Sequence, residues 1–152
     1  MLSFMPPTRH QLSTYAVTLS TFQQHRHFQK TSNAELFISL LFQHREKNRF
    51  LLHGFAVMPD HVHVLITPSI QHSTAICIQF LKGGYSFALK QPKKYPVWKD
   101  GHFTHRIRDV EDFRTQLLYI ANNPAKKNYE SYPHVHSNFA GHLDPEPSHL
   151  SV

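Results

Sequence analysis

The stretch Phe50-Leu-Leu-His-Gly-Phe-Ala-Val-Met-Pro-Asp-His-Val-His-Val-Leu-Ile-Thr-Pro68 decides the fold of this chain. It contains two short apolar segments that are typical of β-strands, separated by Met58-Pro59-Asp60, which is typical of a turn. Side chains alternate between the two faces of a strand, so His61 and His63 share one face of the second strand. Two imidazoles on one face of a rigid strand provide the first two ligands of a metal site.

The His61/His63 pair is one of three His-x-His pairs, the others being His25/His27 and His134/His136. Because the chain has 14 histidines in 152 residues, about one such pair is expected by chance. Only the middle pair lies in a strongly apolar, strand-like segment. The sequence leaves two interpretations of it open: a metal site, or the polar face of a half-buried strand.

The composition suits one compact domain with a basic body. The chain has 152 residues, 40% of them apolar, which is enough for one hydrophobic core. All 16 Lys and Arg lie in residues 1–127 together with seven of the ten acids, so this part carries a charge of +9. The excess favours a polyanionic partner, although an ordinary soluble surface would also account for it.

Cysteine content and hydropathy exclude two classes of protein. The single cysteine, Cys77, excludes an intramolecular disulfide and a cysteine-based zinc cluster. No apolar segment approaches the length of a membrane span, and the N-terminus lacks the charged head and apolar core of a signal peptide. We therefore expect no membrane partner and a cytoplasmic location.

Local patterns in the first half predict an arm, a strand and a helix. Residues 1–12 should form a loose arm, and residues 14–22 a strand rich in β-branched and aromatic residues. A helix capped by Ser32 or Asn33 should then run to about Lys47. The two central strands follow.

A second helix and a strand are expected next. Ser73-Thr74 should start the helix, which continues through Lys90. Gly83-Gly84 within it indicates either the close approach of another backbone, of protein or nucleic acid, or a helix break. The segment from Trp98 to Arg108 should end as a strand.

Asp109-Val-Glu-Asp-Phe113 should open a third helix, because acids in the first turn face the positive end of the helix dipole. Tyr119 lies off the apolar stripe of this helix, and Asn123, four residues later, projects from the same side. Pro124 removes a backbone donor, so the helix should end or kink at Asn123. The segment 131–152 shows no periodicity, and we expect it to be a mobile tail.

Without the third helix, this order is β-α-β-β-α-β, the ferredoxin-like split pattern. The expected fold class is α+β: a ferredoxin-like split β-α-β sandwich with an antiparallel sheet, helices on one face, and a further C-terminal helix. The opposite face of the sheet is left for the site.

The polar residues on that face suggest phosphodiester chemistry. Two neutral imidazoles and the Asn123 amide oxygen could hold a divalent cation, with coordination positions left for a phosphate. A phenol with a pKa of about 10 is a poor nucleophile at neutral pH unless a nearby cation stabilises the phenolate. Such a cation would also polarise the phosphodiester. Tyr119 is thus a candidate nucleophile, although most tyrosines on the polar side of a helix are ordinary surface residues.

At these residues the chain resembles the single-tyrosine nucleases with a His-hydrophobic-His motif, and most closely the REP-associated tyrosine transposases. The similarity extends over roughly residues 14–130, and it implies a transposase domain over residues 13–130 with the third helix as the catalytic helix. Four ordered elements carry it: Met58-Pro-Asp-His-Val-His63, Leu81-Lys-Gly-Gly-Tyr-Ser86, Trp98 through Phe103-Thr-His-Arg-Ile-Arg108, and Tyr119-Ile-Ala-Asn-Asn-Pro-Ala-Lys126.

The resemblance implies that Tyr119 is the nucleophile and that His61 and His63 are ligands of Mg²⁺ or Mn²⁺. Asn123 would be the third ligand, where related insertion-sequence transposases usually have glutamine. The implied substrate is single-stranded or hairpin DNA, as in REP-like palindromes. Its cleavage would leave a 5′-phosphotyrosine and a free 3′-hydroxyl. The implied enzyme is a monomer or homodimer associated with the bacterial nucleoid.

Candidate DNA contacts are the basic residues Lys82, Arg106 and Arg108 for phosphates, and the ring of Tyr85 for a base. Two rival functions remain open. One is a replication or repression protein that binds DNA on the same fold without cutting it. The other is a metal-dependent nuclease that uses water, with Tyr119 only positioning the substrate.

Overall fold

The structure, a computed structural model, describes residues 12–90, 94–126 and 132–150. Its elements follow the predicted order, which confirms the α+β class. The expected arm lies outside the described residues, apart from Leu12. The strands are β1 (Tyr15–Ser20), β2 (Phe50–Met58), β3 (His61–Pro68) and β4 (Phe103–Arg106), and the α-helices are α1 (Thr31–Glu46), α2 (Thr74–Leu89) and α3 (Val110–Lys126).

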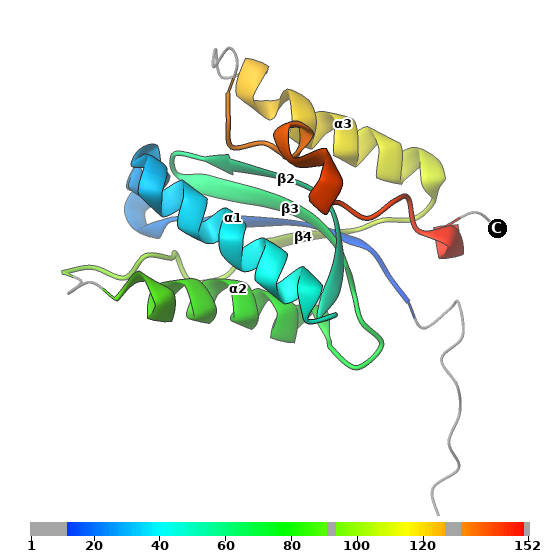
Figure 1. The fold of residues 1–152 in the computed structure, drawn as a ribbon, viewed down its shortest axis with the longest axis horizontal. Helices are drawn as coiled ribbons and strands as arrows, with labels where there is room; N and C mark the ends of the chain where they lie inside the picture. The colour runs from blue at the N-terminus through cyan, green and yellow to red at the C-terminus, as the bar shows by residue number, and fades with distance from the viewer. Residues whose placement is uncertain (1–11, 91–93, 127–131, 151–152) are drawn as a thin grey trace, which may run out of the picture.

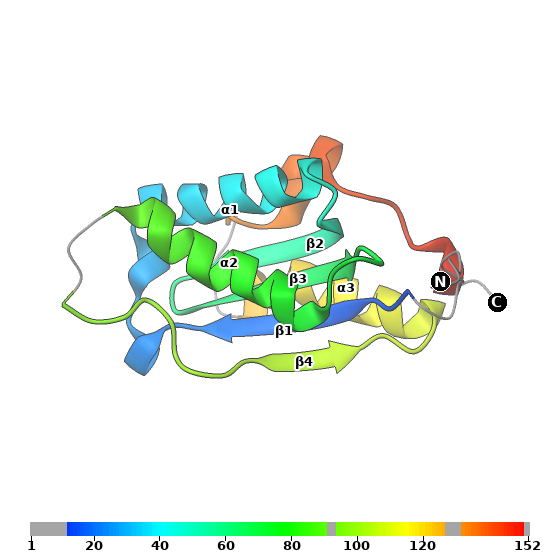
Figure 2. The same cartoon turned by 90° about the horizontal axis from the view of Figure 1, so that it is seen from below.

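The four strands form one antiparallel sheet in the order β2-β3-β1-β4, the order of a ferredoxin-like fold. Helices α1 and α2 cover one face of this sheet, and α3 lies across the other (Figures 1 and 2). The predicted sandwich with one additional helix is therefore confirmed. None of the helices in the described part of the chain has the length and apolarity of a membrane span.

Strand alternation divides the interior into two cores. On the α1 and α2 side, Val62 and Val64 of β3 join a cluster that includes Phe37 of α1 and Leu81 of α2. On the α3 side, a smaller cluster contains Ala56, Met58, Leu65, Phe113 and Ile120. Burial of apolar area on both faces fixes the sheet between its helices.

Gly54 of β2 allows α3 to approach the sheet closely. A Cβ at this position would lie 2.6 Å from Cδ1 at the end of the Leu117 side chain, which would have to move. The absence of a side chain at Gly54 therefore leaves room for the Leu117 and His136 side chains.

The ends of two helices differ from the predictions. Helix α1 begins at Thr31 with no side-chain cap, and the Asn33 amide instead donates to the carbonyl of His27 at 2.9 Å. Helix α3 does not end at Asn123 but continues through Pro124 to Lys126. The proline removes one backbone donor, a loss that is small because it falls in the last turn.

Helix α2 begins as predicted, because Ser73 Oγ accepts a hydrogen bond from the Ile76 amide at 3.1 Å. Within the described residues, Gly83-Gly84 neither breaks the helix nor meets another protein backbone, and the approach of a nucleic-acid backbone stays a prediction. The helix runs unbroken through both glycines. No heavy atom lies within 4 Å of a Cβ built on Gly83, and Gly84 makes only an ordinary contact with the His44 ring.

The prediction of a mobile tail is wrong for residues 132–150, here called the strap. The Tyr132 hydroxyl donates to the carbonyl of Val57, and the Val57 amide donates to the carbonyl of His134 at 2.8 Å. Nδ1 of His136 lies 3.1 Å from both the amide nitrogen and the carbonyl oxygen of Phe55. The strap therefore occupies the outer edge of β2, which would otherwise present unpaired backbone groups.

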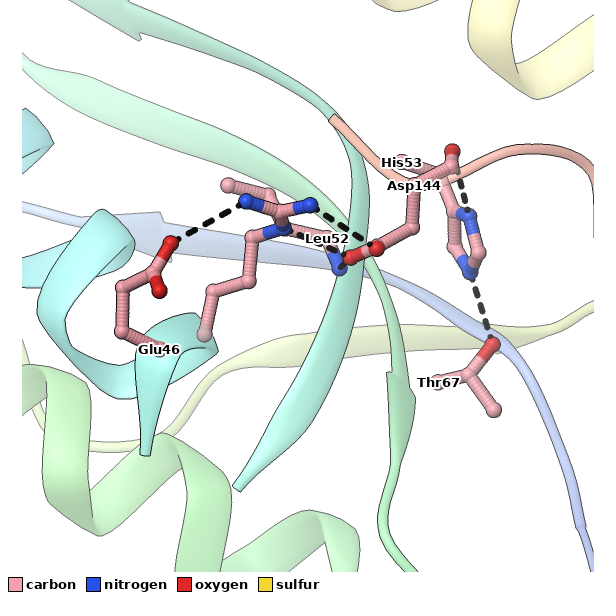
Figure 3. A network of polar contacts seen from close by, with 6 residues as sticks. Glu46, Leu52, His53, Thr67 and Asp144 are labelled. Carbon is pink, nitrogen blue, oxygen red and sulfur yellow. Dashed lines mark hydrogen bonds and ion pairs between the residues drawn. The ribbon is translucent and has the colours of Figure 1, made fainter. Parts of the chain in front are cut away.

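Asp144 fastens the far end of the strap (Figure 3). Its carboxylate accepts from Arg45 Nε at 2.9 Å, from Arg45 Nη2 at 3.1 Å and from the Leu52 amide at 2.8 Å. The Asp144 amide donates in return to the Leu52 carbonyl at 2.7 Å. The Asp144 carbonyl lies 3.2 Å from His53 Nδ1, and His53 Nε2 lies 2.8 Å from Thr67 Oγ1. These bonds involve side chains with no regular spacing, so sequence periodicity did not reveal them.

Candidate active site

The His61 and His63 side chains lie together on the face of the sheet that α3 crosses. Their ring centroids are 4.8 Å apart and the ring planes are nearly perpendicular. Val62 and Val64 point to the other face and pack in the larger core. Because that core immobilises β3, the two imidazoles stand on a rigid base.

Each ring is oriented through its Nδ1 atom. Nδ1 of His63, which is only 9% exposed, lies 3.0 Å from the Thr18 hydroxyl on β1. Nδ1 of His61 donates to the Asp60 carboxylate at 2.7 Å. Hydrogen bonds of this kind fix the ring orientation of metal-binding histidines. Nε2 is therefore the nitrogen that each ring could offer to a cation.

Tyr119 reaches the same place from α3. Its ring centroid lies 5.8 Å from that of His63, and its side chain is 44% exposed. The tyrosine and the histidine pair therefore meet although they are far apart in sequence. An exposed phenol beside two imidazoles is accessible to a substrate from solvent.

Asn123 lies one turn beyond Tyr119, in the direction of the start of β3. Helix α3 runs antiparallel to β3. Phe113 in its first turn contacts His53 of β2, which lies beside the later residues of β3, Leu65 and Ile66. Tyr119, further along the helix, contacts His63 near the start of β3. Asn123 is 3% exposed, and its Oδ1 has no hydrogen-bond partner among the described residues. A buried amide oxygen without a donor is costly. Such an oxygen suits a cation.

These residues fit a divalent cation. Within the described ranges, no group of three or more His, Cys, Asp or Glu side chains is arranged to hold a metal. The donor set would instead be the two imidazoles and the unpaired oxygen of Asn123. Nitrogen and amide-oxygen donors of this kind are compatible with Mn²⁺, and the oxygen with Mg²⁺.

Two predicted DNA contacts serve the fold instead. Tyr85 is fully buried, packs against Phe28 and Trp98, and its hydroxyl lies 2.6 Å from His27 Nε2. Burial raises the pKa of this phenol. The prediction that its ring stacks on a base is wrong in this structure. Lys82 donates to the carbonyls of Lys99 at 2.9 Å and Gly101 at 3.0 Å, and so ties α2 to the loop before β4.

The remaining two predicted contacts are exposed. Arg106 lies on β4 opposite Tyr15, whose side chain packs in the larger core, so it faces away from α3. The Arg108 side chain is 79% exposed and lies 3.7 Å from Asp112. The structure therefore does not gather the four predicted DNA contacts around the histidine pair.

Strand register brings further residues to the site that the sequence did not single out. Thr18 pairs with His63 on one side and with Phe103 on the other, so these three residues form a row across the sheet. Together with α3 they enclose a pocket of about 480 Å³, here called the tyrosine pocket. Its lining includes Thr18, His63, Phe103, His105, Gln116 and Tyr119.

His105 is held at this pocket by a buried carboxylate. Its Nε2 lies 2.8 and 3.0 Å from the two oxygens of Asp112, which also accepts from the Arg108 amide at 2.9 Å. Burial raises the pKa of Asp112, but the bonds from the Arg108 amide and His105 outweigh it, so the net pKa lies below its usual value. Alternation of side chains along β4 predicted that His105 and Phe103 share a face. Only the pairing of β4 with β1 shows that this face lies beside Tyr119.

A second pocket, of about 410 Å³, lies at the other end of the histidine pair and is here called the polar pocket. Its lining includes Ser20, Gln24, Arg26, Pro59, Asp60 and His61. The two pockets share no residue, and each contains one histidine of the pair.

Comparison with known proteins agrees with this arrangement. The family described as "Transposase IS200 like" matches residues 10–123, three quarters of the chain. The chain belongs to this family. The expected resemblance is thereby confirmed, and at this level the chain is a DNA transposase. No curated protein matches the chain.

Two solved structures share the fold of this transposase. A REP-associated tyrosine transposase bound to a REP hairpin has a TM-score of 0.71 and 19% identity, over 88% of this chain and 82% of the other. A proposed transposase from Deinococcus radiodurans has a TM-score of 0.54 and 22% identity, over 78% of this chain and 92% of the other. At these identities the likeness establishes the fold.

Proposed function

We propose that this transposase cleaves and rejoins single-stranded or hairpin DNA through a 5′-phosphotyrosine on Tyr119, with Mg²⁺ or Mn²⁺ held by His61, His63 and Asn123. The observation that carries the proposal is the approach of Tyr119 to His63, with ring centroids 5.8 Å apart. The partly exposed phenol and the pair of oriented imidazoles lie on one face of the sheet, where a phosphodiester could contact both.

The chain's own residues would position the reacting groups. Tyr119 Oη forms a bond to phosphorus as the bond from phosphorus to the 3′-oxygen breaks. The phenol proton passes to water, and the 3′-oxygen takes a proton from water. Thr18 and Asp60 hold the imidazoles in place. A bound divalent cation would polarise the phosphodiester and stabilise the charge that develops on it.

The covalent intermediate accounts for rejoining. A phosphotyrosine keeps the energy of the original phosphodiester, so a 3′-hydroxyl can attack it and regenerate the phenol. The basic body of the chain, with a charge of +9 over residues 1–127, favours a polyanionic substrate. The solved relative that is bound to a REP hairpin supports hairpin DNA as the substrate class.

The test is a labelled hairpin oligonucleotide with single-stranded flanks, incubated with the protein and Mn²⁺ and resolved on a denaturing gel. We expect the fragment with the new 5′ end to migrate with the protein, and the other fragment to end in a 3′-hydroxyl that a polymerase extends. Tyr119→Phe should bind the hairpin as the parent does but form no adduct. Tyr95→Phe is the matched control, since Tyr95 is 49% exposed and does not line the tyrosine pocket.

Three results would contradict the proposal. Free fragments without a protein adduct would indicate a nuclease that uses water. Binding without cleavage in the parent would indicate a DNA-binding protein. Cleavage by Tyr119→Phe would exclude this tyrosine as the nucleophile.

A further inference from the structure

The positions of the two pockets carry an inference about how the DNA strand lies in the site. The tyrosine pocket is lined by His63 and Tyr119, and the polar pocket by His61 and Asp60. His63 pairs with Thr18 and His61 pairs with Ser20, so the two pockets follow each other along β1 and β3. The histidine pair lies between them.

In an in-line displacement, the attacking and leaving oxygens lie on opposite sides of phosphorus. The attacking oxygen belongs to Tyr119, so the leaving 3′-oxygen points away from the tyrosine pocket. We infer that the polar pocket binds the nucleotide that ends in the 3′-hydroxyl and that Gln24 and Arg26 read its base, whereas the tyrosine pocket binds the nucleotide that stays on Tyr119. This inference rests on the proposed function.

A turn with a strained backbone borders the polar pocket and contributes Gln24 to its lining. Gln23 and Gln24 both have left-handed backbone conformations, with φ values of 51° and 56°. Non-glycine residues rarely adopt this region, and where they do the surrounding structure must hold them. Such strain is concentrated at functional sites.

Thr21 holds this strained turn against the site. Its amide donates to the Asp60 carbonyl at 3.0 Å, and its hydroxyl lies 3.0 Å from the same carbonyl and 2.7 Å from the carbonyl of His25. Thr21 is fully buried. The backbone of Gln24 is therefore tied, through Thr21, to the turn that immediately precedes His61, and its exposed side chain lines the polar pocket.

The chemistry of the two linings differs. Gln24 offers both a donor and an acceptor, and Arg26 offers several donors, which are the groups that distinguish one base from another. The tyrosine pocket instead presents Phe103, whose side chain is 67% exposed. Stacking on an aromatic ring accepts any base, because every base has a π-face.

The consequence is an asymmetric sequence requirement at the cut. The nucleotide that ends in the 3′-hydroxyl should be strongly selected for one base, and the nucleotide joined to Tyr119 should be nearly unselected. Loss of a bidentate amide contact to a base should lower the preference about tenfold. Loss of the Phe103 ring should weaken binding about tenfold for all bases alike.

The test uses a pool of hairpin oligonucleotides with a randomised single-stranded flank. After cleavage in Mn²⁺, the free and the protein-linked fragments are sequenced, which gives the base frequency on each side of the cut. Gln24→Ala should flatten the preference on the 3′-hydroxyl side only. Gln23→Ala is the matched control, because Gln23 is the same residue type with the same backbone strain but does not line the polar pocket.

Phe103→Ala is tested in parallel with Phe87→Ala, a phenylalanine that is 82% exposed on α2, on the other face of the sheet. Phe103→Ala should weaken binding without changing base frequencies, and Phe87→Ala should do neither. Base selection on the tyrosine side of the cut would overturn the inference, as would equal effects of Gln23→Ala and Gln24→Ala.

A second measurement separates this inference from the proposed function. The same pool is bound in EDTA, where nothing is cut, and the retained sequences are compared between the parent and Gln24→Ala. If the parent never cuts DNA, the proposed function fails. A base enrichment that Gln24→Ala removes would still support the polar pocket, and an unchanged enrichment would overturn it.

Discussion

Replacing Asp144 by asparagine should weaken the attachment of the strap and destabilise the fold. The carboxylate accepts three hydrogen bonds, two from the Arg45 guanidinium and one from the amide of Leu52, a fully buried residue. The single oxygen of an asparagine amide cannot accept all three, and the NH₂ group beside it would face a donor. If the amide oxygen takes the place of Oδ2, the bonds from Arg45 Nε and the Leu52 amide remain, but the NH₂ group faces Arg45 Nη2 and the negative charge opposite Arg45 is lost.

The cost follows from the groups left unpaired. A hydrogen bond to a charged group contributes about 1.5–3 kcal/mol, and an unpaired buried donor costs about 1–3 kcal/mol. We therefore expect Asp144→Asn to lower the free energy of unfolding by roughly 2 kcal/mol, the contribution of the one charge-assisted bond that is lost. For a chain of this size, that corresponds to a fall in Tm on the order of 5 °C.

The assay is thermal unfolding followed by circular dichroism at neutral pH. Glu146→Gln provides the matched control, since Glu146 makes a similar two-bond pair with Arg114, at 2.8 and 3.2 Å, but on an exposed surface. It should leave Tm almost unchanged, because solvent screens exposed ion pairs. Equal falls in Tm for the two variants, or none for Asp144→Asn, would refute the reasoning.

The pH dependence gives an independent check. Burial raises the pKa of Asp144, but the bonds from Arg45 and Leu52 outweigh it, so the net pKa lies below its usual value. A carboxyl with a depressed pKa in the fold stabilises it above the unfolded pKa of about 3.9, and the contribution is lost as the pH falls through the folded pKa. The difference in Tm between parent and Asp144→Asn should therefore persist at neutral pH and shrink below about pH 4.

Three further predictions concern the strap, the site and the core. Deleting residues 138–152 should lower Tm and solubility, because it removes Asp144 and leaves the backbone of Leu52 on β2 without its partners. A truncated protein as stable as the parent would contradict the docked strap. His63→Ala should abolish cleavage on the hairpin gel while His25→Ala, an exposed control, cuts normally; equal losses would indicate a general charge effect. Tyr85→Phe should lower Tm without changing DNA affinity measured by fluorescence anisotropy, and weaker binding would restore Tyr85 as a DNA contact.

Local sequence patterns determined the order of the elements and which of the predicted site residues share a face of a strand or helix. The two-residue period of a strand put His61 and His63 on one face, and the 3.6-residue period of a helix put Asn123 on the side of Tyr119. These periods depend only on backbone geometry, so they can be read without knowing what packs against what. The same period put Val62 and Val64 on the opposite face, although both faces of β3 are buried in the structure.

Tertiary structure decided what local periods cannot express. The register of β1 against β3 and β4 placed Thr18 between His63 and Phe103, and register depends on pairing across the whole sheet. The local pattern around Tyr85 does not show whether another helix covers its side chain. In the structure α1 packs over it, and Tyr85 is buried in the core. The strap docks through hydrogen bonds between residues far apart in the chain, such as Asp144 and Leu52, which no local pattern records. Sequence by itself thus determined the directions in which side chains point, and only long-range packing determined which side chains meet.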